Sequence, residues 1–179
     1  MLKKGLTFLA IILFVFTSSA VYATKSDELK WDDLIPDGYD PDALVAEYRE
    51  KYGIDDLPDD HPKIQELGKR LEDMLGNAPI VPSLNNKVVK LPGYVVPLET
   101  DGKKSSEFLL VPYYGACVHV PPPPANQTVY VTTKDKKGAK IRGLFDVVWV
   151  TGVMTAERQS TEMAEAGYTI TATLVEPYE

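Results

Sequence analysis

The stretch KVVKLPGYVVPLE, residues 87–99, is the clearest structural signal in the chain. It is rich in valine and also contains leucine and tyrosine, a composition that favours a β-strand. Gly93 lies near the middle of the run, where a glycine predicts a bulge or a sharp bend. We therefore expect a long first strand that bends part-way along its length.

Four further segments downstream are rich in valine, threonine, tyrosine and isoleucine, and one of them contains Gly152. Turn signals such as Asp101-Gly102 and Ala166-Gly167 separate them. Five strands with a long first one predict a small five-stranded OB-like barrel over residues 86–179, antiparallel throughout. The alternative is a five-stranded open sheet with helices on one face. The four segments are 106–114, 128–134, 144–157 and 168–176.

The preceding residues, 24–85, are acidic and have the periodicity of helices. Apolar residues at spacings of three and four predict one helix after Asp40-Pro41 that ends at Gly53, and a second from Pro62 to about Leu75. Helices this short are unstable alone, so we expect a hairpin that packs on the barrel. The predicted fold class is mainly β with an N-terminal helical segment (α+β).

The first 23 residues have the three parts of a secretory signal peptide. Lys3 and Lys4 supply the positive charge, residues 6–16 are apolar, and Val21-Tyr22-Ala23 fits the cleavage site. The apolar run is too short to cross a bilayer. No cysteine lies near the cleavage site, so a lipid anchor is not expected. These features predict a mature periplasmic protein that begins at Thr24 and has no membrane anchor.

Charge and cysteine content exclude several classes of protein. The formal charge is −7, and it becomes −9 once Lys3 and Lys4 are removed with the signal peptide. Nucleic acid is therefore not an expected partner, because its phosphates require a basic surface. The single cysteine, Cys117, excludes an intramolecular disulfide, a Cys₄ zinc site and a CxxC redox motif.

Three segments resemble one family of exported bacterial proteins. They are LPGYVVPLE at 91–99, FLLVPYYGACVHVPPPPANQ at 108–127 and VWVTGVM at 148–154. Together they resemble the domain of unknown function 3299 family over residues 80–177. The resemblance implies a small periplasmic β domain without an assigned activity. It also implies a genomic setting beside ABC-type export systems and metal-linked envelope proteins, so an ABC-type envelope transport system is the partner it suggests.

Cys117 and His119 are the candidate metal ligands. In an extended chain, residues two apart point to the same side, so the thiol and the imidazole would share a face. The four prolines at 121–124 favour a stiff polyproline II segment after them. Thiolate and imidazole suit Zn²⁺ or Cu(I). Two ligands are too few for a closed site, so His61, a carboxylate, water or a second subunit of a homodimer would complete it.

Two other interpretations of this pair stay open. Cys117 could be a buried free thiol, with His119 bonded to a backbone carbonyl. The pair could also be a nucleophile and its base, although no third group that orients the imidazole is identifiable. Four aromatic residues could line a ligand face or simply pack between strands: Tyr94, Tyr113, Tyr114 and Trp149.

These observations favour a non-enzymatic binding or accessory module of an envelope transport or metal-handling system. A metal-binding protein that uses Cys117 and His119 is the second hypothesis. A thiol-dependent enzyme is the third. No cofactor is certain; Zn²⁺ and Cu are the ones the residues allow.

Overall fold

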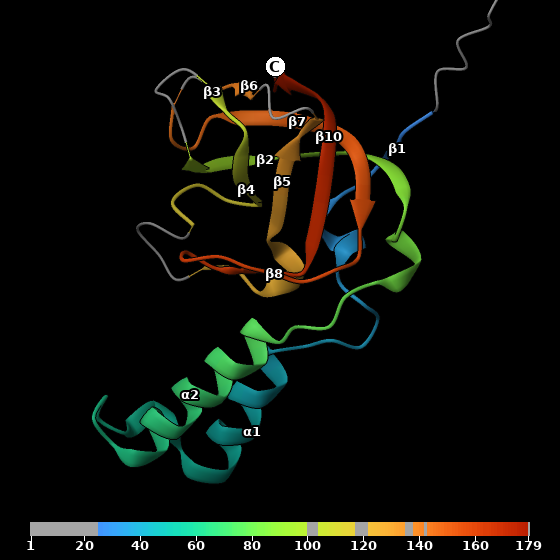
Figure 1. The fold of residues 1–179 in the computed structure, drawn as a ribbon. Helices are drawn as coiled ribbons and strands as arrows, with labels where there is room; N and C mark the ends of the chain where they lie inside the picture. Colours follow the sequence, from blue (N-terminus) through green and yellow to red (C-terminus); the bar gives the residue numbers. More distant parts are fainter. Residues whose placement is uncertain (1–24, 100–103, 117–121, 135–137, 142, 179) are drawn as a thin grey trace, which may run out of the picture.

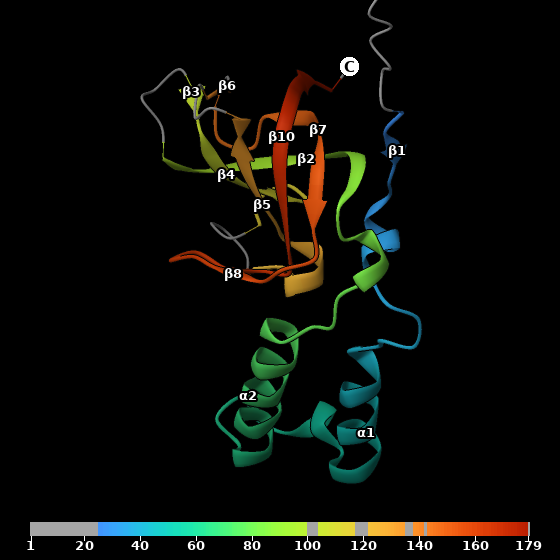
Figure 2. The same cartoon turned by 45° about the vertical axis from the view of Figure 1, so that its right-hand side comes forward.

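The computed structural model describes residues 25–99, 104–116, 122–134, 138–141 and 143–178. The predicted signal peptide, residues 1–23, and the candidate ligands Cys117 and His119 lie outside these ranges. A β-barrel forms the larger part of the structure, and two helices lie side by side beyond one end of it (Figures 1 and 2). None of the helices in the described ranges is long and apolar enough to span a membrane.

Five strands close into a barrel in the order β2, β4, β5, β10, β7, and β7 pairs back with β2. This is the strand order of an OB fold and confirms the predicted OB-like barrel. The expectation that all strands are antiparallel was wrong, because β5 and β10 run parallel. The last strand, β10, lies between β5 and β7 in this order. The strands are β2 (Lys87–Glu99), β4 (Glu107–Val111), β5 (Val129–Thr133), β7 (Val147–Thr155) and β10 (Tyr168–Pro177).

Closure of the barrel depends on the long strand β2, which pairs on both sides. Its first half pairs with β7 and its second half with β4, and the change occurs at Gly93 and Tyr94. A Cβ atom at Gly93 would lie 2.7 Å from Cγ of Leu110 and 2.9 Å from Cζ2 of Trp31. A glycine is needed here because the strand turns inward against two large side chains.

Short strands of two residues each also occur beside the barrel. They were not predicted, because two residues are too few for a periodic pattern. β1 (Asp27–Glu28) runs parallel to β2, while β3 (Lys104–Ser105) pairs with β6 (Ala139–Lys140). The third pair, β8 (Gln159–Ser160) and β9 (Glu165–Ala166), forms a hairpin between β7 and β10. This β8–β9 hairpin helps to form the candidate site described below.

The main core fills the barrel and has the inward residues of all five strands. Leu34, from the 3₁₀ turn at Trp31–Leu34 (η1), joins this core, so the segment before the helices belongs structurally to the barrel. Alternation along the strands places every second residue inside. The fully buried side chains include Val89, Leu91, Val95, Phe108, Leu110, Val129, Val131, Val150, Met154, Tyr168 and Ile170.

The helical hairpin consists of α1 (Asp42–Tyr52) and α2 (Pro62–Gly76), close to the predicted bounds. Gly53 ends α1 in the left-handed conformation with φ of 60°, as a glycine C-cap does. The buried residues Tyr48, Ile54 and Leu67 form a small hydrophobic cluster of their own. The hairpin is therefore held together by its own core, separate from the interior of the barrel.

Arg158, in the loop after β7, joins the end of α2 to the barrel. Its guanidinium donates hydrogen bonds to the backbone carbonyls of Gly76 at 2.9 Å and Ala78 at 2.7 Å. The last carbonyls of a helix have no partner within the helix and carry partial negative charge. The guanidinium of Arg158 satisfies one of these, the carbonyl of Gly76, and its bond to Ala78 holds the chain just after the helix, so Arg158 connects the end of α2 to the barrel.

We expect Arg158→Ala to lower the free energy of unfolding by about 1–2 kcal/mol, because two charge-assisted hydrogen bonds are lost at a partly exposed site. Urea unfolding followed by circular dichroism measures this change. Hydrogen exchange should accelerate in the last turn of α2. Arg49→Ala is the control: the exposed pair of Arg49 and Asp55 should contribute at most about 0.5 kcal/mol. Equal effects of the two variants would contradict the role of Arg158.

Candidate ligand-binding cleft

The surface on which many OB folds bind their ligands is filled in this protein by its own side chains. The outer face of β4 carries Leu109 and Val111, both fully buried. Residues Ala164 and Ala166 of the β8–β9 hairpin pack over this face, together with Phe145. A ligand cannot reach this face while the hairpin covers it.

The four aromatic residues considered as a ligand face do not form one surface. Tyr114 packs against Tyr94 and Phe145, with ring centroids 6.2 and 4.7 Å apart. Trp149 instead stacks on Tyr178 at 5.3 Å and has Lys90 over its ring. The arrangement fits local packing of strand aromatics.

Tyr130 lies at the edge of the covered face, and its hydroxyl donates a hydrogen bond of 2.6 Å to Glu107. Burial, and then the bond to this carboxylate, raises the pKa of Tyr130 to about 12. The ordinary pKa of tyrosine is about 10. Between these two values the native state keeps a proton that the unfolded chain has lost.

We therefore expect stability to be full below about pH 10 and to fall as the pH rises toward 12, by about 1 kcal/mol for this residue. Tyr130→Phe should remove that part of the alkaline decline. Urea unfolding of wild type and variant at about pH 9 and about pH 11 measures the difference. A constant difference between the two proteins at both pH values would rule out the contribution of Tyr130.

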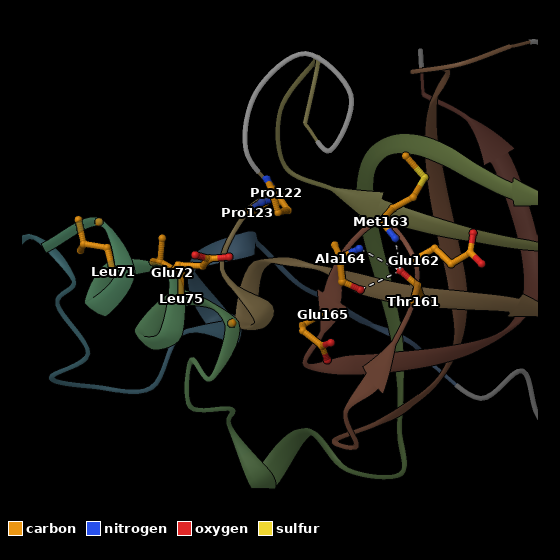
Figure 3. A pocket seen from close by; sticks show the side chains of 12 residues that line it. Leu71, Glu72, Leu75, Pro122, Pro123, Thr161, Glu162, Met163, Ala164 and Glu165 are labelled. Atoms are coloured by element: carbon orange, nitrogen blue, oxygen red, sulfur yellow. Dashed lines mark hydrogen bonds between the residues drawn. The ribbon is translucent and has the colours of Figure 1, made fainter. Parts of the chain in front are cut away.

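A cleft of about 600 Å³ lies between α2 and the β8–β9 hairpin (Figure 3). One face of α2 forms one wall, residues of the hairpin turn form the other, and Pro122 and Pro123 lie between them. Helix residues at spacings of three and four share a face, which explains how α2 presents one continuous wall. The helix contributes Gly68, Leu71, Glu72, Leu75 and Gly76, and the hairpin contributes Thr161, Glu162, Met163, Ala164 and Glu165.

Hydrogen bonds within its turn hold the hairpin wall in place. The hydroxyl of Thr161 donates to the carbonyl of Ala164 at 2.8 Å and accepts from its backbone N–H at 3.0 Å. Glu165 accepts a hydrogen bond of 2.5 Å from the hydroxyl of Ser160. The wall opposite α2 is therefore a preformed surface rather than a loose loop.

The candidate ligands Cys117 and His119 lie outside the described residues, but the residues on either side of them are described. Ala116, which precedes Cys117, is fully buried, and Pro122 and Pro123, which follow the Cys-Val-His segment, line the cleft. His61 accepts a hydrogen bond from the N–H of Lys63 at the start of α2, the end of the helix away from Leu75 and Gly76. Within the described ranges, no three histidine, cysteine or acidic side chains are grouped to hold a metal ion.

A second hollow, of about 400 Å³, lies near β6 at the end of the barrel away from the helices. Thr133, Lys134 and Lys140 are among the residues that line it, together with Leu174 of β10. The charged residues described in this hollow are lysines, whereas those described in the cleft are glutamates.

Comparison with known proteins identifies the family. The model described as Protein of unknown function (DUF3299) matches residues 31–177. The chain belongs to the DUF3299 family. The match begins at Trp31, so the helical hairpin is part of this family, whereas the sequence resemblance covered only residues 80–177.

A crystal structure of another DUF3299 protein, from Pseudomonas aeruginosa PAO1, is similar to this one. The TM-score is 0.64 and the sequence identity 41%, and the alignment covers 87% of this chain and 97% of that chain. A search of curated proteins gave no match. This chain and that protein therefore have similar folds over most of their lengths.

The cleft residues were not recognised in the sequence. Leu71 and Leu75 were assigned to the apolar stripe of a helix, and residues 161–165 fell between the predicted strands at 144–157 and 168–176. One signal could have pointed to the site: Gly68 lies in the middle of α2, where glycine destabilises a helix by about 1 kcal/mol relative to alanine.

Proposed function

We propose that this DUF3299 protein is a non-enzymatic binding module of the periplasm and an accessory to an envelope transport or metal-handling system. The observation that carries the proposal is the cleft of about 600 Å³ between α2 and the β8–β9 hairpin. Pockets that bind small molecules have volumes of roughly 300–1,000 Å³ and are mostly apolar with a few polar groups. The cleft has this size and this character.

The covered outer face of the barrel supports the same assignment. Leu109 and Val111 are fully buried, so the outer face of β4, which helps to bind ligands in other OB folds, is covered here. The helical hairpin adds a second wall that an OB barrel lacks. Ligand binding is thus moved from the strands to the junction of the barrel with α2.

Localisation and partner rest on the sequence. The signal-peptide pattern of residues 1–23 supports export to the periplasm, and the resemblance to proteins encoded beside ABC-type export systems supports such a system as the partner. A binding module that delivers a ligand to a transporter requires a cleft open to solvent on one side. The cleft between α2 and the hairpin meets this requirement.

Native purification tests the binding function. Mature protein should be isolated from the periplasm without a denaturing step, extracted with solvent, and analysed by mass spectrometry beside Gly68→Leu. A Cβ atom at Gly68 has no neighbour within 4 Å, so the leucine should fill the cleft without disturbing the fold. We expect a small molecule that accompanies the wild type and is depleted at least tenfold in the variant. Identical extracts from two equally stable proteins would contradict a ligand site in this cleft.

Metal binding by Cys117 and His119 is the second candidate function. It is favoured by the position of Pro122 and Pro123, which follow the Cys-Val-His segment and lie in the same cleft as Glu72 and Glu165. Thiolate and imidazole would be the primary ligands, with a carboxylate available as a third. Zn²⁺ and Cu(I) are the metal ions that thiolate and imidazole ligands suit.

Thermal melts with a chelator and with added Zn²⁺ test this candidate. A metal that binds only the native state raises the melting temperature by mass action. We expect Zn²⁺ to raise the melting temperature of the wild type and to have no effect on Cys117→Ser or His119→Ala. A wild type that does not respond to Zn²⁺ or Cu(I) would remove the metal hypothesis and leave the binding cleft unaffected.

A further inference from the structure

The cleft has a one-sided charge. Among the described residues that line it, three are glutamates and none is a lysine, arginine or histidine. Glu72 on α2 has no hydrogen bond or ion pair with any described residue, and Glu165 has only the neutral hydroxyl of Ser160 as a partner. Arg158 lies near one end of α2, but its guanidinium is engaged by the carbonyls of Gly76 and Ala78. Two carboxylates, one on each wall, therefore have no counter-charge among the residues that the structure describes.

The floor of the cleft is apolar and extends along two turns of α2. Leu71 and Leu75 form it on the helix side, with Pro122, Pro123 and Ala164 on the barrel side. The helix wall runs from Gly68 to Gly76, about 12 Å at 1.5 Å per residue. A straight apolar chain of a few bonds matches this floor, and water alone fits it poorly.

Gly68 is the third observation, and it is independent of charge. It is exposed in the middle of α2, its Cβ position is open, and alanine there would stabilise the helix by about 1 kcal/mol. The protein's own packing therefore gives no reason for a glycine at this point. Gly68 lies on the wall of the cleft, where the absence of a side chain leaves room for another molecule beside the helix backbone.

We propose that this cleft binds a small organic cation, with an ammonium or guanidinium group between Glu72 and Glu165 and an apolar chain over Leu71 and Leu75. The inference rests on the proposed binding function and adds the class of ligand. Ca²⁺ and Mg²⁺ are disfavoured by the apolar floor, because these ions require six or more oxygen ligands. An anion would meet like charges on both walls.

Three probes of equal length and different charge test the ligand class: octylammonium, octanoate and octan-1-ol, each below its aggregation concentration. Isothermal titration measures the affinity of the wild type for each probe. Two partly exposed ion pairs contribute about 0.2–1 kcal/mol each, so octylammonium should bind about 2–30 times more tightly than octanol. Raising the NaCl concentration from about 0.02 M to about 0.5 M should reduce this preference, because salt screens exposed charges.

Charge variants locate the contact. Glu72→Gln and Glu165→Gln should each lower the preference for octylammonium about two- to fivefold, and the double variant should remove it. Glu162→Gln is the matched control: it removes the same charge from the same hairpin, but the side chain of Glu162 points away from α2 (Figure 3). Its preference should stay within about twofold of the wild type.

Two glycine variants separate this inference from the binding function itself. Gly68→Ala should raise the free energy of unfolding by about 1 kcal/mol and yet weaken octylammonium binding. Gly68→Leu should reduce the binding of every probe at least tenfold. If Gly68→Leu abolishes probe binding but the wild type shows no preference for the cation, the binding cleft stands and the ligand class is wrong. If none of the probes responds to Gly68→Leu, the cleft is not the site.

One further arm distinguishes a free cation from a lysine of a partner protein. The tripeptide acetyl-Leu-Lys-Leu amide presents the same ammonium on a peptide. We expect octylammonium to bind at least as tightly as the tripeptide. Tight binding of the tripeptide with no binding of octylammonium would overturn the small-molecule assignment.

Discussion

Gly152→Ala is expected to destabilise the protein by more than about 4 kcal/mol and to prevent accumulation of soluble protein. An added Cβ atom would collide with the backbone oxygen of Thr171 and would lie 2.8 Å from Cα of Ala172. These are backbone atoms of the neighbouring strand β10, so no rotamer change can relieve the contact. The pairing of β10 with β7, which helps to close the barrel, would have to open.

The measurement is urea unfolding of the purified variant, or the soluble yield where purification fails. Gly68→Ala is the matched control, because it makes the same chemical change where no atom lies within 4 Å of the added carbon. The two variants should change stability in opposite directions. An unfolding midpoint of Gly152→Ala equal to that of the wild type would contradict the close approach of β7 and β10.

Tyr168→Phe is expected to lower the free energy of unfolding by about 2–4 kcal/mol, the second largest effect. The ring of Tyr168 is fully buried, and its hydroxyl makes two hydrogen bonds. It donates to the carbonyl of Leu34 at 2.7 Å and accepts from the N–H of Val81 at 2.6 Å. The variant leaves both backbone groups without a partner in a region that water reaches poorly.

These two bonds connect the barrel with the chain on both sides of the helical hairpin. Leu34 precedes α1 and Val81 follows α2, so one hydroxyl on β10 holds both connections. Hydrogen exchange should therefore accelerate at residues 31–34 and 80–84 in the variant before it does so in the strands. Tyr178→Phe, which removes an exposed hydroxyl near the C-terminus, is the control and should change stability by less than about 0.5 kcal/mol.

Burial raises the pKa of Tyr168 above its ordinary value. The native state therefore keeps this proton at a pH where the unfolded chain loses it, and stability declines as the pH rises above about 10. Tyr168→Phe should reduce that decline as well as the stability at neutral pH. If the variant is as stable as the wild type both at neutral pH and above about pH 10, the hydroxyl of Tyr168 does not hold the segments around Leu34 and Val81.

Features that depend on residues close together in the sequence were predicted correctly. The apolar spacing in residues 40–52 and 62–75, with glycines at the ends, was sufficient to predict both helices. The long run at 87–99 was sufficient to predict β2 and its bend at Gly93. The ends of the strands were predicted less accurately. The segment predicted to end at residue 114 ends as β4 at Val111, directly before Pro112. The segment predicted to begin at residue 144 begins as β7 at Val147, after Phe145 with its φ of 60°.

Gly152 in β7 shows that the alternation of residues along a strand does not reveal which strand lies beside it. A glycine inside a strand favours a bulge, and in the pairing of Gly152 the irregularity lies on the opposite strand, between Ala172 and Leu174 of β10. A glycine in a strand indicates that something comes close, but the sequence does not say which segment does so. The partner strand is fixed by barrel closure, which is a property of the whole chain.

Sequence patterns were enough to predict the two helices, the five main strands and the OB-like barrel, and short motifs were enough to indicate the family. Each of these depends on residues that are neighbours in the chain or on a repeating spacing, so a local pattern is enough. Only the tertiary structure decided that β5 and β10 are parallel, that the β8–β9 hairpin covers the outer face of β4, and that α2 faces that hairpin across a cleft. These features join residues far apart in the chain, from about 40 positions for Val129 and Tyr168 to about 90 for Glu72 and Glu165. Their contacts arise from packing around a closed barrel, which leaves no periodic trace in the sequence.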